Sequence, residues 1–185
     1  TCLKSTKESI DADIEEKKGL IKTYIQGEET IKTQILYEEY SNDDIEIINA
    51  IIENNGIYAR KDAPFNWKWV IWDDSVPKRV TELHLSQGTM TGTLNVSGLT
   101  NLRVLHCDRN QLTDLNLKDL PNLTNLNCGY NELNTLEVNH LSNLIRLDCD
   151  FNKLDTLEIN NLLNLEYLSC EDNNLITLKA NRLSN

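Results

Sequence analysis

The chain has 185 residues, and its 29 acidic against 18 basic residues give a formal net charge of −11 at pH 7. Such a charge repels phosphate backbones, and no basic stripe offsets it, so the composition argues against nucleic-acid binding. An acidic, well-solvated surface explains the charge, and so does a basic partner. The sequence has no apolar stretch long enough to cross a bilayer as a helix, so we expect no membrane insertion.

Residues 1–40 are predicted to form one or two helices. The tetrapeptide from Ser5 to Glu8 has the residue types of a helix-starting capping box, and Gly27 marks a break between two helical stretches. The first stretch carries a stripe of isoleucines at helical spacing: Ile10, Ile14, Ile21 and Ile25. This stripe suits docking onto the rest of the chain or self-association. The sequence leaves both open, as it does a lipid modification of Cys2.

Residues 41–79 are predicted to form a cap for the repeats that follow. Ser41 and Asp44 have the spacing of a helix start, and Asn54-Asn55-Gly56 is typical of a helix end. Between them isoleucines recur at helical spacing: Ile45, Ile47, Ile48, Ile51 and Ile52. Three tryptophans follow at positions 67, 69 and 72. Core packing and a carbohydrate-binding platform are the two interpretations of these rings, and we favour core packing.

Five consecutive units with one apolar pattern occupy residues 80–185. The first unit, 80–101, has 22 residues, and each of the other four has 21. Seven apolar positions recur in every unit, and in the second unit they are Leu102, Leu105, Cys107, Leu112, Leu115, Leu117 and Leu120. A unit this short cannot bury seven apolar side chains against itself, so each unit must stack on its neighbours.

The beginning of each unit alternates apolar and polar residues with the period of a strand. Strands stacked in register form a parallel sheet on one face, and the rest of each unit returns the chain along the opposite face, too briefly for a long helix. One asparagine row is expected to satisfy backbone groups after the strands: Asn110, Asn131, Asn152 and Asn173, with Gly88 in the first unit. A second row of asparagines, at 101, 122, 143, 164 and 185, is expected to satisfy backbone groups at the turns in a similar way.

Cys107, Cys128, Cys149 and Cys170 occupy one position of the repeat, where the first unit has Leu85. Zinc sites use closely spaced cysteine pairs, whereas these four come one per unit. Parallel side chains one rung apart are also poorly placed for a disulfide. We therefore expect the four thiols to point into the core as small hydrophobic groups.

The Leu-x-x-Leu-x-Cys stretch followed by the asparagine row resembles the leucine-rich-repeat family over residues 80–185. The unit length and the cysteine variant look most like bacterial surface and secreted members, the internalin-like group among them. The resemblance implies an α/β solenoid, a right-handed superhelix with a parallel concave sheet, and residues 41–79 are similar to the family's α-helical amino-terminal cap. That cap often carries a cysteine pair, and the lack of one here implies a cap held by hydrophobic packing alone.

The resemblance also implies that the concave sheet binds a protein partner. Outward strand positions are free of core constraints, so the side chains there are candidate contacts. Together with two turn residues, the candidate partner-binding residues are Glu82, His84, His106, Asn125, Asn127, Tyr130, Arg146, Asp148, Phe151 and Tyr167. Tyr130, Phe151 and Tyr167 fall on adjacent rungs and are predicted to form one aromatic patch.

No catalytic, metal or cofactor site is predicted. His84 and His106 are in neighbouring units near Glu82, but a histidine pair on a polar face is more often plain surface than a metal site. The sequence has no nucleophile motif and no Gly-rich phosphate loop, and a shallow solenoid face excludes little water.

The sequence therefore predicts a protein-binding module of a bacterial cell-surface or secreted protein, and hence an extracellular or cell-surface location. Two alternatives stay open: a structural solenoid that self-associates through its last repeat, and a targeting arm for an enzyme domain. No polar closing unit covers Leu165, Leu175 and Leu183, so we expect the array to continue.

Overall fold

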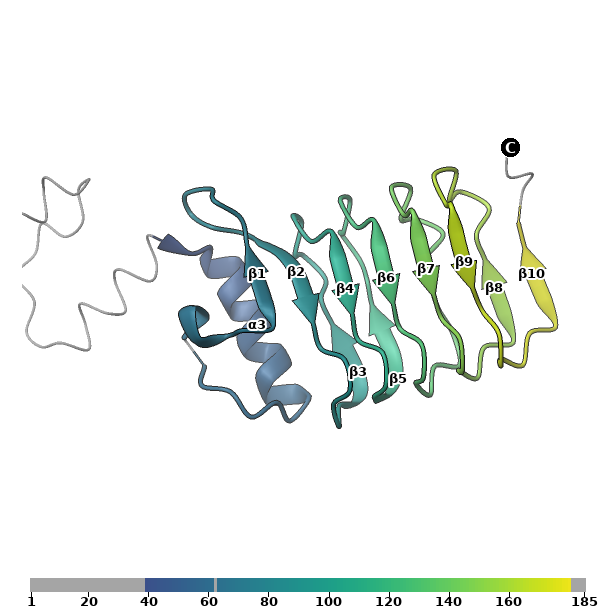
Figure 1. Cartoon of the computed structure of the whole chain (residues 1–185), viewed down its shortest axis with the longest axis horizontal. Helices are drawn as coiled ribbons and strands as arrows, with labels where there is room; N and C mark the ends of the chain where they lie inside the picture. Colours follow the sequence, from purple (N-terminus) through teal and green to yellow (C-terminus); the bar gives the residue numbers. More distant parts are fainter. Residues whose placement is uncertain (1–38, 62, 181–185) are drawn as a thin grey trace, which may run out of the picture.

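The computed structural model describes residues 39–61 and 63–180. These residues form a row of stacked coils with the α-helix α3 (Asn42–Asn54) beside the first coil (Figure 1), and a short 3-10 helix, η1 (Pro64–Asn66), follows α3 in the chain. The helices expected before residue 39 lie outside the described residues, as do Cys2 and the last repeat positions Leu183 and Asn185.

One face of the coils carries a six-stranded sheet in the order β1-β2-β4-β6-β7-β9 (Figure 1). Its strands are β1 (Val70–Trp72), β2 (Val80–His84), β4 (Val104–His106), β6 (Asn125–Asn127), β7 (Arg146–Asp148) and β9 (Tyr167–Ser169). β1 runs antiparallel to β2, and the other neighbours are parallel. The central leucines pair from coil to coil in the order Leu83, Leu105, Leu126, Leu147 and Leu168. The prediction of one strand per unit in a parallel sheet is confirmed.

The return segments of the coils also contain strands. β3 (Thr91–Asn95) pairs in parallel with β5 (Gln111–Asn116), and β8 (Thr156–Glu158) pairs in parallel with β10 (Thr177–Lys179). Residues 80–180 contain no helix, because alternate residues of a return segment, such as Leu115 and Leu117, enter the core and keep the backbone extended. The predicted α/β class therefore applies only through the cap helix α3, and the coils themselves form a β-solenoid.

The apolar positions of the repeat form the core. In the first four units each of the seven positions is at most 8% exposed. In the fifth unit Leu165, Leu168, Cys170 and Leu175 are only partly buried, and Leu178 is 48% exposed. Burial therefore comes from neighbouring coils, because a side chain that is covered in an inner coil loses cover in the last described one.

The first asparagine row makes the backbone contacts expected of it. The Asn131 side chain donates from Nδ2 to the carbonyl oxygens of Cys107 (3.0 Å), Cys128 (3.1 Å) and Gly129 (3.3 Å). Its Oδ1 accepts a hydrogen bond from the Leu112 N–H at 3.0 Å. Equivalent bonds are made by Asn110, Asn152 and Asn173. Each amide thus bridges its own coil and the preceding coil.

The second asparagine row also joins successive coils. Asn122, Asn143 and Asn164 donate to the carbonyl oxygens of Thr100, Pro121 and Ser142 at 2.8, 2.7 and 2.9 Å. In the first unit the place of the first row belongs to Gly88, where a Cβ would lie 2.7 Å from Asn110 Oδ1. A side chain at Gly88 would therefore clash with the asparagine of the next coil.

The cysteine row lies in the core, as predicted. Cys107, Cys128 and Cys149 are free and buried, and Cys170 in the last described coil is free and partly buried. Burial raises the pKa of all four thiols, and nearby acidic groups raise it further. The four side chains therefore act as neutral core groups at physiological pH.

Helix α3 begins and ends where the sequence predicts. The Ser41 Oγ accepts a hydrogen bond from the Asp44 N–H at 3.3 Å and so caps the first turn. At the other end the Asn55 N–H bonds to the Ile51 oxygen at 3.0 Å. The buried isoleucines of the helix are Ile45, Ile48, Ile51 and Ile52, and Ile47 packs against them from a partly buried position.

The three tryptophans pack in the cap core and do not form an exposed platform. Trp67 is 2% exposed, and its Nε1–H donates to the Arg60 oxygen at 2.8 Å. Trp69 and Trp72 are partly buried, and their rings stack against Trp67 with centroids 6.2 and 6.3 Å away. Tyr40, just before the helix, contacts the Trp72 ring edge-on at 4.8 Å. The favoured interpretation, core packing, is confirmed.

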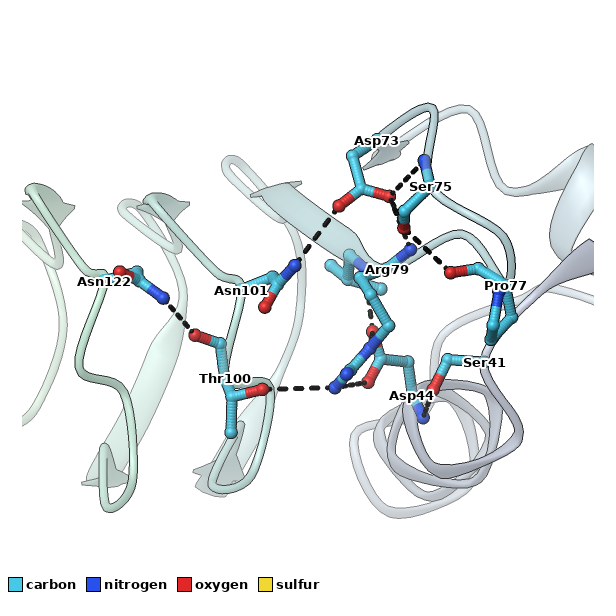
Figure 2. Close-up of polar contacts among 10 residues, drawn as sticks. Ser41, Asp44, Asp73, Ser75, Pro77, Arg79, Thr100, Asn101 and Asn122 are labelled. Atoms are coloured by element: carbon cyan, nitrogen blue, oxygen red, sulfur yellow. Dashed lines mark hydrogen bonds and ion pairs between the residues drawn. The ribbon is translucent and has the colours of Figure 1, made fainter.

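A buried ion pair joins the cap to the first coil (Figure 2). The Asp44 side chain is fully buried and accepts hydrogen bonds from Arg79 Nε (3.0 Å), Arg79 Nη2 (2.8 Å) and the Val80 N–H (2.7 Å). Arg79 Nη2 also donates to Thr100 Oγ1 at 3.2 Å, which reaches the end of the first unit. The expectation that hydrophobic packing alone holds the cap is therefore wrong, because a charged network crosses the same boundary.

A second carboxylate, Asp73, joins the cap to the coils above this ion pair (Figure 2). It accepts hydrogen bonds from Ser75 Oγ, the Arg79 N–H (2.9 Å) and Asn101 Nδ2 (3.2 Å). Asn101 belongs to the second asparagine row, so Asp73 takes the place that a carbonyl oxygen has in later coils. Partial burial acts to raise the pKa of Asp73, but the hydrogen bonds outweigh it and lower the pKa from 3.8 to about 2.

The lowered pKa predicts how acid weakens the cap. Because the folded pKa lies below 3.8, the Asp73 carboxylate stabilises the folded state above that pH, and this contribution is lost as the pH falls toward 2. We expect Asp73→Asn to destabilise the protein at neutral pH and the difference from wild type to shrink below pH 3.8. Urea unfolding followed by tryptophan fluorescence measures both. Asp74→Asn, at the exposed neighbouring position, is the control; a difference for Asp73→Asn that does not change with pH would contradict the prediction.

Candidate partner-binding face

The outward side chains of the parallel strands form one surface, which we call the sheet face. It comprises the outward residues of β2, β4, β6, β7 and β9 and the turn that follows each strand. Strand pairing aligns Glu82, Val104, Asn125, Arg146 and Tyr167 in one row, and His84, His106, Asn127, Asp148 and Ser169 in a second. The structure thus places all the predicted strand residues on this surface, with Tyr130 and Phe151 in its turns.

Each turn after a strand has one residue with left-handed backbone. The five φ angles are 59° for Gln87, 56° for Arg109, 55° for Tyr130, 51° for Phe151 and 49° for Asp172. This conformation costs residues other than glycine roughly 1–2 kcal/mol, and asparagine and aspartate tolerate it best. Tyr130 and Phe151 therefore occupy positions where bulky rings are unfavourable for the backbone.

The Tyr130 and Phe151 rings stack on each other at adjacent rungs. Their centroids are 4.2 Å apart with an interplanar angle of 14°. The two side chains are 43% and 41% exposed, so the stack faces solvent. The Arg109 guanidinium lies over the Tyr130 ring, 4.4 Å from its centroid, and extends the stack by one rung.

Tyr167 forms a separate aromatic contact on the sheet face. It lies on β9 and is 41% exposed, and the Arg146 guanidinium lies 4.3 Å from its ring centroid. Among the described residues, ring contacts join Tyr130 to Phe151 but not to Tyr167. The predicted single patch of three rings is therefore a stacked pair plus a third ring paired with arginine, because Tyr167 comes from the strand and the other two from the turns.

The two histidines lie at the cap end of the sheet face. Their rings meet edge-on with centroids 5.1 Å apart, and His84 Nε2 is 2.9 Å from Glu82 Oε2. Across residues 39–61 and 63–180, no three or more His, Cys, Asp or Glu side chains group closely enough to hold a metal ion. His84, His106 and Glu82 thus contact one another on the polar surface.

Carboxylates gather beside the aromatic stack. Asp150, in the turn after β7, accepts hydrogen bonds from Ser169 Oγ and the Glu171 N–H, both at 2.6 Å. Burial raises the pKa of Asp148, and the negative charges of Asp150 and Asp108 raise it further. Because these carboxylates destabilise one another's charge, this part of the sheet face is suited to a positively charged group.

Sequence reasoning missed several side chains of this surface. Arg109, Asp150 and Asp172 were not among the predicted contacts, although each follows a strand at a fixed position of the repeat. These residues would have been included if the candidate contacts of every unit had covered the turn positions after the strand as well as the outward strand positions. The contact of Arg109 with the Tyr130 ring had no signal in the sequence, because it depends on the left-handed turn geometry.

None of the described helices is long and apolar enough to cross a bilayer. No family model matches the sequence, and no curated protein matches it significantly. Among solved structures, the chain is similar to the leucine-rich-repeat ectodomain of the receptor kinase SOBIR1 from Arabidopsis thaliana, with 19% sequence identity and a TM-score of 0.52. The similarity covers 77% of this chain and 98% of that ectodomain, and at this identity it shows the fold alone. Together with the stacked coils, the parallel sheet and the asparagine row, it identifies the fold of this chain as a leucine-rich-repeat solenoid.

Proposed function

We propose that the chain is a binding module whose sheet face recognises another protein. The observation that carries this proposal is the exposed Tyr130–Phe151 stack, in which both rings stand at left-handed turn positions. Large aromatic side chains at the centre of a surface are the residues that most often dominate binding energy between proteins. Concave or flat repeat surfaces offer such contacts without requiring any change of fold.

The fold does not need aromatic residues at these two positions. Gln87 and Asp172 occupy the equivalent positions in other coils with similar φ angles, 59° and 49°. A ring at either position therefore adopts an unfavourable backbone conformation, and a smaller polar residue would lower that cost. The ring also leaves apolar surface exposed to water. Residues that are unfavourable for the folded chain alone are frequently retained for function, which supports recognition as their role.

The first test replaces both rings by asparagine. In Tyr130→Asn/Phe151→Asn, relief of the backbone cost offsets the loss of the stack, worth about 0.5–1.5 kcal/mol, so the free energy of unfolding should change by less than about 1 kcal/mol. Partner capture should fall by about tenfold or more, since two central anchors are lost. Immobilised wild type and variant are compared by quantitative mass spectrometry after incubation with surface and secreted proteins of the source organism and of neighbouring cells.

The matched control removes exposed apolar side chains elsewhere. Leu163→Asn/Ile176→Asn takes away side chains that are 75% and 89% exposed and lie outside the strands and turns of the sheet face. This control should retain the captured proteins. Equal capture by wild type and the aromatic variant would show that the sheet face at Tyr130 and Phe151 does not bind them.

We also propose that the module belongs to a bacterial cell-surface or secreted protein. The support is the unit of 21 residues with its cysteine row, which resembles that group of repeat proteins. Self-association through the last described coil is a second proposal, favoured by the partial exposure of Leu165, Leu168 and Leu175. Light scattering over a range of protein concentrations tests it, and a constant monomer mass would exclude it.

A further inference from the structure

The sheet face has an unequal balance of charges that points to the chemistry of its partner. Its carboxylates are Glu82, Asp108, Asp148, Asp150, Glu171 and Asp172, and its only arginines are Arg109 and Arg146. Each arginine lies over a tyrosine ring, at 4.4 Å for Arg109 and 4.3 Å for Arg146. Both cations on this surface are thus already engaged with aromatic rings.

Four of the carboxylates have no basic side chain within ion-pair distance among the described residues: Asp148, Asp150, Glu171 and Asp172. All four lie on the coil of Phe151 or on the next one: Asp148 is on β7, Asp150 follows β7, and Glu171 and Asp172 follow β9. Glu171 and Asp172 are exposed, and Asp148 and Asp150 are partly buried. This half of the sheet face is therefore acidic and accessible.

The aromatic stack stops at Phe151. Along the turn positions the row reads Arg109, Tyr130, Phe151 and then Asp172, with one residue per coil. Tyr130 has a guanidinium on one side and the Phe151 ring on the other. At the next coil the row has a carboxylate in place of a ring, so a cation seated against Phe151 would stand close to Asp172.

We propose that this surface binds an extended, arginine-containing basic segment of a partner protein, with one arginine side chain stacked on Phe151 at the end of the row. Because neighbouring strands are about 4.8 Å apart, the carboxylates from Asp108 to Asp172 span roughly 14 Å along the sheet. One side chain cannot reach across that distance, so several basic residues of one extended segment are needed. The inference rests on the proposed function, since it names the partner's chemistry at the same face.

Arginine suits this surface better than lysine or a metal ion. A guanidinium is planar and weakly hydrated, so it stacks on rings while donating hydrogen bonds to carboxylates at its edge. The two internal arginines already show that the rings of this surface accept a guanidinium in that position. The carboxylates are spread over several coils and do not close around one point, which disfavours a single metal ion.

The experiment uses three short fluorescently labelled peptides, in which serine alternates with arginine, lysine or glutamate. Fluorescence anisotropy should give the tightest binding for the arginine peptide, with a Kd several-fold lower than for the lysine peptide and no binding of the glutamate peptide. Added salt should weaken the binding of the arginine peptide only partly, because the stacking of arginine on the ring remains. Equal affinity for the arginine and lysine peptides, or no binding of either, would overturn the inference.

Two variants locate the site. Asp148→Asn/Asp150→Asn keeps the side-chain shapes and should raise the Kd of the arginine peptide by about tenfold, which is 1.4 kcal/mol. Glu137→Gln/Asp155→Asn removes the same charge from exposed positions on the return side and should change the Kd less than twofold. An equal loss in both variants would mean attraction to net charge alone and would also overturn the inference.

Failure of this inference is distinguishable from failure of the proposed function. If the arginine peptide does not bind while Tyr130→Asn/Phe151→Asn still loses captured proteins, the sheet face binds a partner of other chemistry. If the aromatic variant captures the same proteins as wild type, the proposed function itself fails, whatever the peptides do.

Discussion

Replacing Asp44 by asparagine is expected to lower the free energy of unfolding by about 3–5 kcal/mol, because it breaks a buried ion pair by removing one partner. The carboxylate is 0% exposed and receives three hydrogen bonds, two from Arg79 and one from the Val80 N–H. In asparagine one acceptor oxygen becomes an NH2 group that faces a donor. The Arg79 side chain is 27% exposed, so it would keep its charge with little solvent to compensate.

The control is Asp43→Asn, one position earlier in the same first turn. Asp43 is exposed, so the change removes the same charge near the helix start without opening a buried site. It should cost no more than about 1 kcal/mol. Urea unfolding followed by tryptophan fluorescence reports on the cap directly, because all three tryptophans lie there. Similar losses for the two variants would show that charge near the helix, and not the pair with Arg79, stabilises the cap.

Asn131→Asp is expected to destabilise the solenoid by at least about 3 kcal/mol, because it places a carboxylate oxygen against three carbonyl oxygens in a buried site. The amide Nδ2 of Asn131 donates to the oxygens of Cys107, Cys128 and Gly129. Aspartate retains the acceptor for the Leu112 N–H but loses every one of these donated bonds. The change keeps the side-chain shape, so the loss comes from the missing donated bonds and from the added charge beside the carbonyl oxygens.

Asn134→Asp is the matched control for this second prediction. Asn134 lies in the same unit at an exposed position, so the same added charge should change stability by no more than about 0.5 kcal/mol. Chemical unfolding followed by circular dichroism measures both variants. A lower slope of the transition for Asn131→Asp would further show that the interrupted coil uncouples its neighbours. If aspartate at 131 is tolerated as well as at 134, the asparagine row does not hold the coils together.

The repeat explains why so much of the solenoid was predictable. Positions that recur every 21 residues meet the same neighbours, so Leu105 and Leu126 predict the register of their strands and Asn110 and Asn131 predict the turn contacts. The return strands were missed, because Leu115 and Leu117 are compatible with either short helical or extended backbone until the neighbouring coil is present.

The cap and the details of the sheet face lacked such a signal. Asp44 and Arg79 are 35 residues apart in sequence and belong to no repeat, so nothing in the sequence paired them. Tyr130 and Phe151 were identified as candidates from their positions, but their stacking depends on the left-handed turns. Tyr167 was expected to join the same patch because it lies on an adjacent rung, but it extends from β9, and the ring stack joins only the two turn residues.

The asparagine row has a polarity that bears on how the chain comes apart. The Asn152 side chain bonds to groups of its own coil and to Cys128 and Leu133 of the coil before it, and among the described residues it has no hydrogen bond to the coil after it. Unfolding of a later coil therefore breaks no hydrogen bond of the asparagine side chains that remain folded. Unfolding of an earlier coil, in contrast, leaves the asparagine side chain of the next coil without its partners. Unravelling should thus proceed vectorially, from the coil farthest from the cap toward helix α3.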